Sequence, residues 1–304
     1  MTFLTEVEHG LQKAIACSHE ILGKTALSNI LAVKVWEWLP LIIIEGANLS
    51  TALRLKLFEK VYYALKTCSP TTPIEVILTA RFQRLYGEKI LTNNDIFTML
   101  CSMQKPDGGW NENQSYGISS IPTTYAVLNF LLGFKKGTDI DVIRQQGGNY
   151  LLSLWEENLA KDGLAFKNAQ CLMIMVEFSR RGLAPPDLVK QNTKETIEQL
   201  EKRQSSRGSW GSFYPTLGKC DLDVYLASTL MTAITTDAIA QSARVINNHE
   251  FVRRLSTIAR KGIEFIASQQ HEAGFWFADS GTCFLKTLGW GIKAYQGFLL
   301  SNRL

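Results

Sequence analysis

Apolar residues recur every three or four positions along almost the whole chain, the spacing that gathers them on one face of an α-helix. The strict alternation typical of strands is nearly absent. The pattern predicts twelve helices, at residues 4–20, 26–45, 50–66, 74–86, 93–103, 122–135, 139–157, 165–181, 187–203, 222–240, 250–268 and 282–301. The sequence therefore predicts an all-α protein.

A glutamine is followed six residues later by a tryptophan at three places, with a glycine-containing turn between them. The pairs are Gln104 and Trp110, Gln204 and Trp210, and Gln270 and Trp276. Each pair lies between two predicted helices, so the repeat is a helix, a turn and a helix of roughly 50 residues, with a fainter copy at 157–164. The glutamine amide can bond open carbonyls at the end of the preceding helix while the indole covers the turn. We expect this motif to clamp neighbouring helical hairpins together.

Length and composition fit one domain. The chain has 304 residues, 46% of them hydrophobic, and no linker rich in proline and serine interrupts it. We therefore predict a single domain over 1–304, with clear repeats near 93–135, 195–240 and 250–301.

Charge and cysteine content limit the classes of partner. The net charge is +4, with basic and acidic residues interleaved, which argues against a nucleic-acid partner. Six cysteines lack paired spacing, and no signal-peptide pattern precedes them. These features predict a cytoplasmic protein; they do not decide its oligomeric state.

The most apolar stretch, residues 30–44, contains Lys34 and Glu37 and is too short and too charged to span a bilayer. A buried helix is the first interpretation. Trp36 and Trp38 leave peripheral contact with a membrane surface as the alternative.

The spacing of glutamine and tryptophan resembles the QW repeats of the prenyltransferase and squalene-oxidase-repeat superfamily, which includes squalene-hopene cyclases, class II diterpene cyclases and protein prenyltransferase β subunits. The three clear copies cover roughly residues 90–304. The resemblance implies a single (α/α)6 toroid with inner and outer helices around an apolar cavity. It also implies a single-domain class II terpene cyclase, similar to the merosterolic acid synthase type. Such an enzyme binds a small isoprenoid and needs no metal or organic cofactor.

Asp221 and Asp223 resemble the DxDD acid motif of class II terpene cyclases, and Val224 stands where the last aspartate of that motif would be. The resemblance implies that Asp223 is the proton donor and Asp221 its supporting partner. A neighbouring carboxylate and desolvation both raise the pKa of a carboxyl group, which makes its neutral form available at neutral pH.

Helix capping is the competing interpretation of these two aspartates, because Asp is common at helix starts. In the first clear repeat, Thr123 takes the place of Asp223, and Tyr125 that of Tyr225. That helix start is built without carboxylates, which favours the catalytic interpretation.

Aromatic faces can stabilise a carbocation without reacting with it. Three candidates for the cavity wall lie after repeat turns on predicted inner helices: Tyr225, Phe284 and Trp290. Four more lie near the turns: Tyr116, Phe166, Phe213 and Tyr214. Ordinary core packing is the alternative for each of them.

Asp279, Cys283 and His271 raise a zinc-site interpretation, but the Asp-x-Cys pairing of prenyltransferase β subunits is absent, and no magnesium-binding carboxylate cluster is present. We predict no metal. Two alternatives to a cyclase remain: a zinc-dependent subunit resembling prenyltransferase β chains, and a non-catalytic toroid that binds lipid or peptide.

Overall fold

The computed structural model describes residues 3–27, 31–135, 137–160, 164–211, 228–277 and 284–302. These ranges contain twelve α-helices joined by turns and loops. Their bounds are α1 Phe3–Leu27, α2 Leu31–Glu45, α3 Thr51–Thr67, α4 Pro73–Tyr86, α5 Asn93–Ser102, α6 Ile121–Leu131, α7 Thr138–Ala160, α8 Ala165–Arg180, α9 Pro186–Arg203, α10 Thr229–Val245, α11 His249–Ser268 and α12 Phe284–Ser301.

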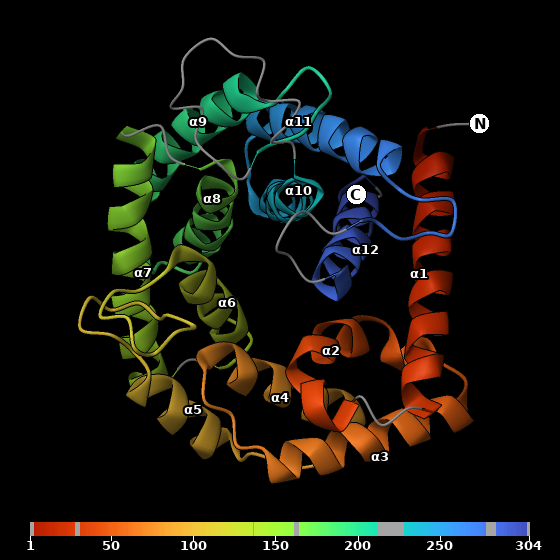
Figure 1. Ribbon diagram of the computed structural model, residues 1–304. Coiled ribbons are helices and arrows are strands. Elements are labelled where there is room, and N and C mark those ends of the chain that lie inside the picture. The colour runs from red at the N-terminus through yellow and green to blue at the C-terminus, as the bar shows by residue number, and fades with distance from the viewer. Residues whose placement is uncertain are drawn as a thin grey trace.

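The helices form two concentric rings (Figure 1). The even-numbered helices form the inner ring, in which each packs against the next and α12 packs against α2. The odd-numbered helices surround them, and the first outer helix, α1, lies beside α11 and α12 near the end of the chain. The predicted all-α toroid is therefore confirmed.

Polar caps fix where several inner and outer helices begin. Thr72 and Thr92 each form a capping box with the acid three residues later, at the starts of α4 and α5. Ser120 caps α6 and Ser228 caps α10, each through its hydroxyl and the third backbone amide of the helix.

Several predicted boundaries are wrong. The helix expected to end at residue 20 extends to Leu27, and the next begins at Leu31, not at 26. The helix expected at 222–240 is α10, which begins at Thr229 and ends at Val245. The backbone of Ser228 is extended, and its hydroxyl accepts a hydrogen bond from the amide of Met231 at 3.0 Å. Because Ser228 is the N-cap of α10, neither Asp221 nor Asp223 has that role.

Candidate functional site: the lumen of the toroid

The tryptophan of each repeat fastens the turn to the outer helix that precedes it. All three indoles are buried, and each Nε1 donates to a backbone carbonyl ten residues earlier. The pairs are Trp110 with Leu100 (2.8 Å), Trp210 with Leu200 (3.2 Å) and Trp276 with Ile266 (2.7 Å). A carbonyl in the last turn of each of α5, α9 and α11 is thus bound by an indole group, not by a glutamine as the sequence suggested; those of Leu200 and Ile266 also accept a backbone amide.

The glutamine of each repeat joins its turn to the next outer helix. Each side-chain Nε2 donates both to the glycine carbonyl of its own turn and to a carbonyl of that helix. The second acceptors are Ile143 of α7 for Gln104 (3.2 Å), Ile258 of α11 for Gln204 (2.9 Å) and Gly10 of α1 for Gln270 (2.9 Å). The predicted clamp is confirmed, and the third copy closes the ring by linking α11 to α1 (Figure 1).

The second repeat is longer than the first between its tryptophan and the threonine that accepts the tryptophan amide. The Trp110 amide donates to Thr124, fourteen residues on, and the Trp210 amide donates to Thr232, twenty-two residues on. Thr124 and Thr232 therefore correspond, and the expected pairing of Thr123 with Asp223 is wrong. The expected pairing of Tyr125 with Tyr225 is wrong for the same reason. Both aspartates lie between Trp210 and Ser228, outside the described residues.

The predicted site residues fall into three groups. Asp221, Asp223, Tyr225, Phe213 and Tyr214 lie outside the described residues. Phe284 is the first residue of α12, where only the backbone is described.

The remaining three predicted side chains are described. Trp290 and Phe166 are half-buried, on the inner helices α12 and α8. Tyr116 is 59% exposed on the loop between α5 and α6, so it is not part of an enclosed wall.

Partly accessible side chains recur every three or four residues on α2, α4, α6 and α12, whereas residues 168–178 of α8 and 232–240 of α10 are all buried. On α4 they are Ile74, Leu78 and Arg81, and on α12 they are Trp290 and Lys293. Further members are Trp36, Pro40 and Ile44 of α2, Ala126 and Asn129 of α6, and Met231 and Gln241 of α10. We call the region that the inner helices surround (Figure 1) the lumen. Its described lining is mostly apolar.

Four ionisable side chains on four inner helices shift one another's pKa: Asp237 of α10, Lys293 of α12, Arg81 of α4 and Tyr125 of α6. Asp237 of α10 is 4% exposed and accepts a hydrogen bond from Gln241 at 2.7 Å. Burial raises the pKa of Asp237, whereas Lys293 of α12 and the Gln241 hydrogen bond oppose the rise. Burial lowers the pKa of Lys293; Asp237 opposes this shift, and Arg81 of α4 adds to it.

The fourth member is Tyr125 of α6. Burial raises the pKa of its hydroxyl, with Asp237 adding to the rise and Arg81 opposing it. These mutual effects connect ionisable groups on α4, α6, α10 and α12.

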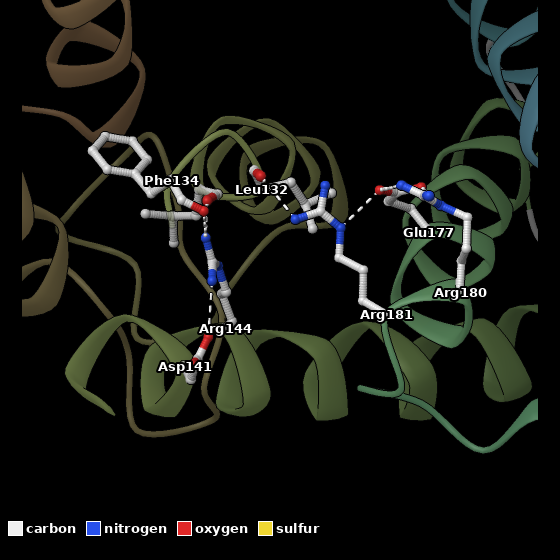
Figure 2. Close-up of polar contacts among 8 residues, drawn as sticks. Leu132, Phe134, Asp141, Arg144, Glu177, Arg180 and Arg181 are labelled. Carbon is white, nitrogen blue, oxygen red and sulfur yellow. Dashed lines mark hydrogen bonds and ion pairs between the residues drawn. The ribbon is translucent and has the colours of Figure 1, made fainter. Parts of the chain in front are cut away.

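A second charged cluster lies at the end of α6 and is structural. Arg144 of α7 is 1% exposed, and its Nη2 donates to the carbonyls of Leu131 and, at 2.8 Å, of Phe134. Its Nη1 pairs with Asp141 at 2.8 Å (Figure 2). The guanidinium thus binds the last carbonyl of α6 and a carbonyl of the turn that follows it.

Arg181, the C-cap residue of α8, binds a carbonyl at the same end of α6. Its Nη1 donates to the Leu132 carbonyl at 2.9 Å, and its Nε donates to Glu177 at 2.7 Å (Figure 2). Hydrogen bonds from Arg180 first, and from Arg181, hold the pKa of Glu177 below its usual value against the opposing effect of burial. These arginines connect α6, α7 and α8.

Two further findings concern the described residues only. No three side chains of His, Cys, Asp or Glu within those ranges gather as a metal ion would require. None of the helices there combines the length and apolarity needed to cross a bilayer.

No protein-family model matches the chain, and no curated protein matches its sequence. Solved structures match its fold. The type II terpene cyclase MstE from Scytonema, in complex with its substrate geranylgeranyl dihydroxybenzoate, has a TM-score of 0.59 and 11% identity, over 98% of this chain and 99% of that one. A structure from Klebsiella pneumoniae subsp. pneumoniae, described as a possible member of the GH105 family, has a TM-score of 0.55 and 12% identity, over 96% and 93%.

The ent-copalyl diphosphate synthase from Streptomyces platensis has a TM-score of 0.50 and 14% identity, over 86% of this chain and 49% of that one. At these identities the similarity establishes the fold, which is found in enzymes of different chemistry.

Proposed function

We propose that the protein is a class II terpene cyclase that protonates a linear isoprenoid and closes its rings by cationic addition. The observation that supports this proposal best is the lumen, whose described lining is mostly apolar and holds one small group of ionisable side chains. Such a lining can fold a hydrocarbon chain while keeping water from the carbocations.

In this proposal Asp223 is the proton donor and Asp221 its supporting partner. The acid proton passes to one carbon of a terminal alkene, or to an epoxide oxygen, and leaves a carboxylate on the enzyme and a carbocation on the substrate. Internal double bonds then attack in turn, and loss of a proton or capture by an internal nucleophile ends the reaction. Ser228 is the N-cap of α10, so the two aspartates do not cap that helix. This supports the catalytic assignment over the capping hypothesis.

Asp237 is a second candidate donor, which the sequence did not single out. It is a buried carboxyl group on an inner helix, and desolvation favours its neutral form. Lys293 acts against that form, which is why Asp223 remains the first assignment.

Because MstE holds geranylgeranyl dihydroxybenzoate as its substrate, a prenylated aromatic acid is the first compound to test. The purified protein is incubated with this compound and with other linear isoprenoids, with and without EDTA. We expect a product of unchanged mass that forms equally well in EDTA. Activity that disappears in EDTA and returns with zinc would instead support the prenyltransferase-like alternative.

Asp223→Asn is expected to lower turnover by roughly 100-fold or more while preserving the helical circular-dichroism spectrum, because a positioned general acid contributes about that much. If Asp223→Asn turns over at the parental rate and Asp237→Asn does not, Asp237 is the donor. If neither change matters and substrate binds without conversion, the protein is a binding module.

A further inference from the structure

A cavity of about 250 Å³ lies between α4, α5 and α6, which are neighbours in the ring (Figure 1). Its bottom is apolar and buried, and is formed by Ala80, Ile96 and Phe130. Its rim is polar and exposed, and includes Arg84, Glu88, Lys89 and Asn93. A small cavity with an apolar bottom and a few polar groups at its mouth suits a ligand smaller than most drug-sized molecules.

The cavity and the lumen lie on different sides of α4. The cavity is lined by Ala80 and Arg84 of this helix. The partly accessible residues Ile74, Leu78 and Arg81 belong to the row that recurs on the inner helices, which we call the lumen stripe. At about 3.6 residues per turn, the two sets occupy different faces of the helix. A ligand of the cavity is therefore distinct from a ligand of the lumen.

Hydrogen bonds fix both walls of the cavity. In the loop that leads from α4 to α5, the backbone of Leu91 donates to the Gln83 side chain at 2.8 Å and accepts from it at 2.8 Å. On the other side, the carbonyl of Phe134 accepts from Arg144 at 2.8 Å (Figure 2). The charge of Arg144 is balanced by Asp141. Because these walls are held in place by the protein itself, a ligand has little ordering cost to meet.

Arg84 has no anionic partner among the residues that the structure describes. Its guanidinium carbon lies 5.7 Å from the centre of the Phe134 ring and 6.0 Å from that of Phe130. The two rings meet edge to face, with their centres 5.1 Å apart. Within the described residues, the guanidinium forms neither an ion pair nor a hydrogen bond. The rings can hold the guanidinium in place, but its N–H donors remain available to an anion.

Positive charge prevails around the mouth of the cavity. The acids there are Glu88 and Asp95, and the cations are Arg81, Arg84, Lys89 and Lys135. Asp95 is also held by the backbone amide of Thr92, at 2.8 Å, in the capping box of α5. An excess of positive charge favours an anionic ligand over a cationic one.

We propose that this cavity binds a small aromatic carboxylate, with its ring against Ala80, Ile96 and Phe130 and its carboxylate on the guanidinium of Arg84. A guanidinium offers two parallel N–H donors that match the two oxygens of a carboxylate. The ring gains apolar contact by leaving water. This binding site is additional to the proposed cyclase reaction and depends on none of its steps.

The test follows para-fluorobenzoate by fluorine NMR as the purified protein is added. para-Fluorobenzamide has the same ring without the charge, and trifluoroacetate has the charge without the ring. Arg84→Met removes the guanidinium, and Arg84→Lys keeps the charge without the paired donors. Arg81→Met is the matched control, because Arg81 lies on the same helix but on the lumen stripe. Since Arg84 is exposed, both of its variants should unfold within about 2 °C of the parent.

We expect para-fluorobenzoate to bind with a Kd of roughly 0.1–1 mM, as suits a ligand of few atoms. It should bind roughly 10-fold more tightly than the amide or trifluoroacetate, because each of these lacks one of the two contacts. Arg84→Met should weaken binding roughly 10-fold or more, and Arg84→Lys about threefold. Arg81→Met should change the Kd by less than about threefold, since it removes no direct contact.

The proposal is wrong if the amide binds as tightly as the acid, or if both Arg84 variants bind as the parent does. Binding that is lost in Arg81→Met and retained in Arg84→Met would place the ligand in the lumen and overturn the proposal. Stronger displacement by phenyl phosphate than by unlabelled benzoate would assign the cavity to phosphates. None of these measurements depends on turnover. A protein that cyclises isoprenoids without binding para-fluorobenzoate would retain the proposed function and lose this site, and one that only binds the acid would do the reverse.

Discussion

Gly208→Ala tests how closely the turn of the second repeat approaches α11. Gly208 has a φ of +89° in the turn that follows α9. A Cβ at this position would collide with the backbone carbonyl of Lys261 on α11, placing the Lys261 carbonyl carbon only 2.6 Å away. Backbone atoms inside a helix cannot move aside as a flexible side chain can, so the turn and α11 must separate.

The substitution lowers the free energy of unfolding in two ways. An alanine in the left-handed region costs about 1–2 kcal/mol. Separation also breaks the 2.9 Å hydrogen bond from Gln204 to Ile258 and loosens the buried Trp210 indole, for about 2–3 kcal/mol more. An unfolding entropy of about 2 cal/mol/K per residue over 304 residues corresponds to about 0.6 kcal/mol per degree. We therefore expect Tm to fall by about 5–8 °C.

Gly182→Ala is the matched control, because Gly182 has a φ of +72° but nothing lies within 4 Å of its Cβ position. It carries the conformational cost alone and should lower Tm by about 2–3 °C. Both variants are compared by urea and thermal unfolding followed by circular dichroism. Equal losses in the two variants would show that close approach to α11 contributes nothing, and the clamp description would be wrong.

Two further predictions concern buried polar groups, and both are checked by urea unfolding. Trp210→Phe removes the Nε1 donor to Leu200 and part of a buried ring, and should lower the free energy of unfolding by about 2–3 kcal/mol; a change below 0.5 kcal/mol would contradict the geometry. Glu177→Gln should cost about 1–3 kcal/mol at pH 7, because the carboxylate is hydrogen-bonded by Arg180 and Arg181 (Figure 2). The folded-state pKa of Glu177 lies below its unfolded value, so its stabilisation is present above the unfolded pKa and is lost as pH falls through the folded pKa. The difference between parent and variant should therefore shrink at acidic pH, and a difference independent of pH would contradict this assignment.

The helices and the repeat clamps could be predicted because both depend on local sequence. Periodicity sets the helices, and the glycine turn at each Gln–Trp pair is recognisable by itself. The second acceptor of each glutamine could not be predicted, since Gly10 lies 260 residues from Gln270. The start of α10 was missed because the second repeat is longer than the first between its tryptophan and Ser228, the cap of α10.

Asp237 and Lys293 were missed for a different reason. Each lies in mid-helix, where a charged residue usually faces solvent, and the proximity of α10 to α12 emerges only from the closed ring. One signal was available: Asp237 is the only acid in α10, among threonine, alanine and isoleucine residues that are otherwise buried. A lone acid in the buried middle of a helix, whose other charged residue, Arg244, lies in the last turn, indicates an internal polar site.

The outer helices and their turns contribute most to stability, whereas the inner helices carry the residues that we expect to determine which ligand is bound. The clamps lie between outer helices and turns, where glycine carbonyls, indoles and glutamines meet backbone atoms that any helix provides. The residues of the lumen stripe contribute less to this closure, because each retains accessible surface and packs on one side only. Substitutions on the stripe, such as Arg81→Met, can therefore change which molecule is bound with little effect on unfolding, whereas Gly208→Ala should destabilise the protein whatever the lumen holds. Because contacts between the outer helices and the turns hold the ring together, the residues at its centre can vary with the ligand.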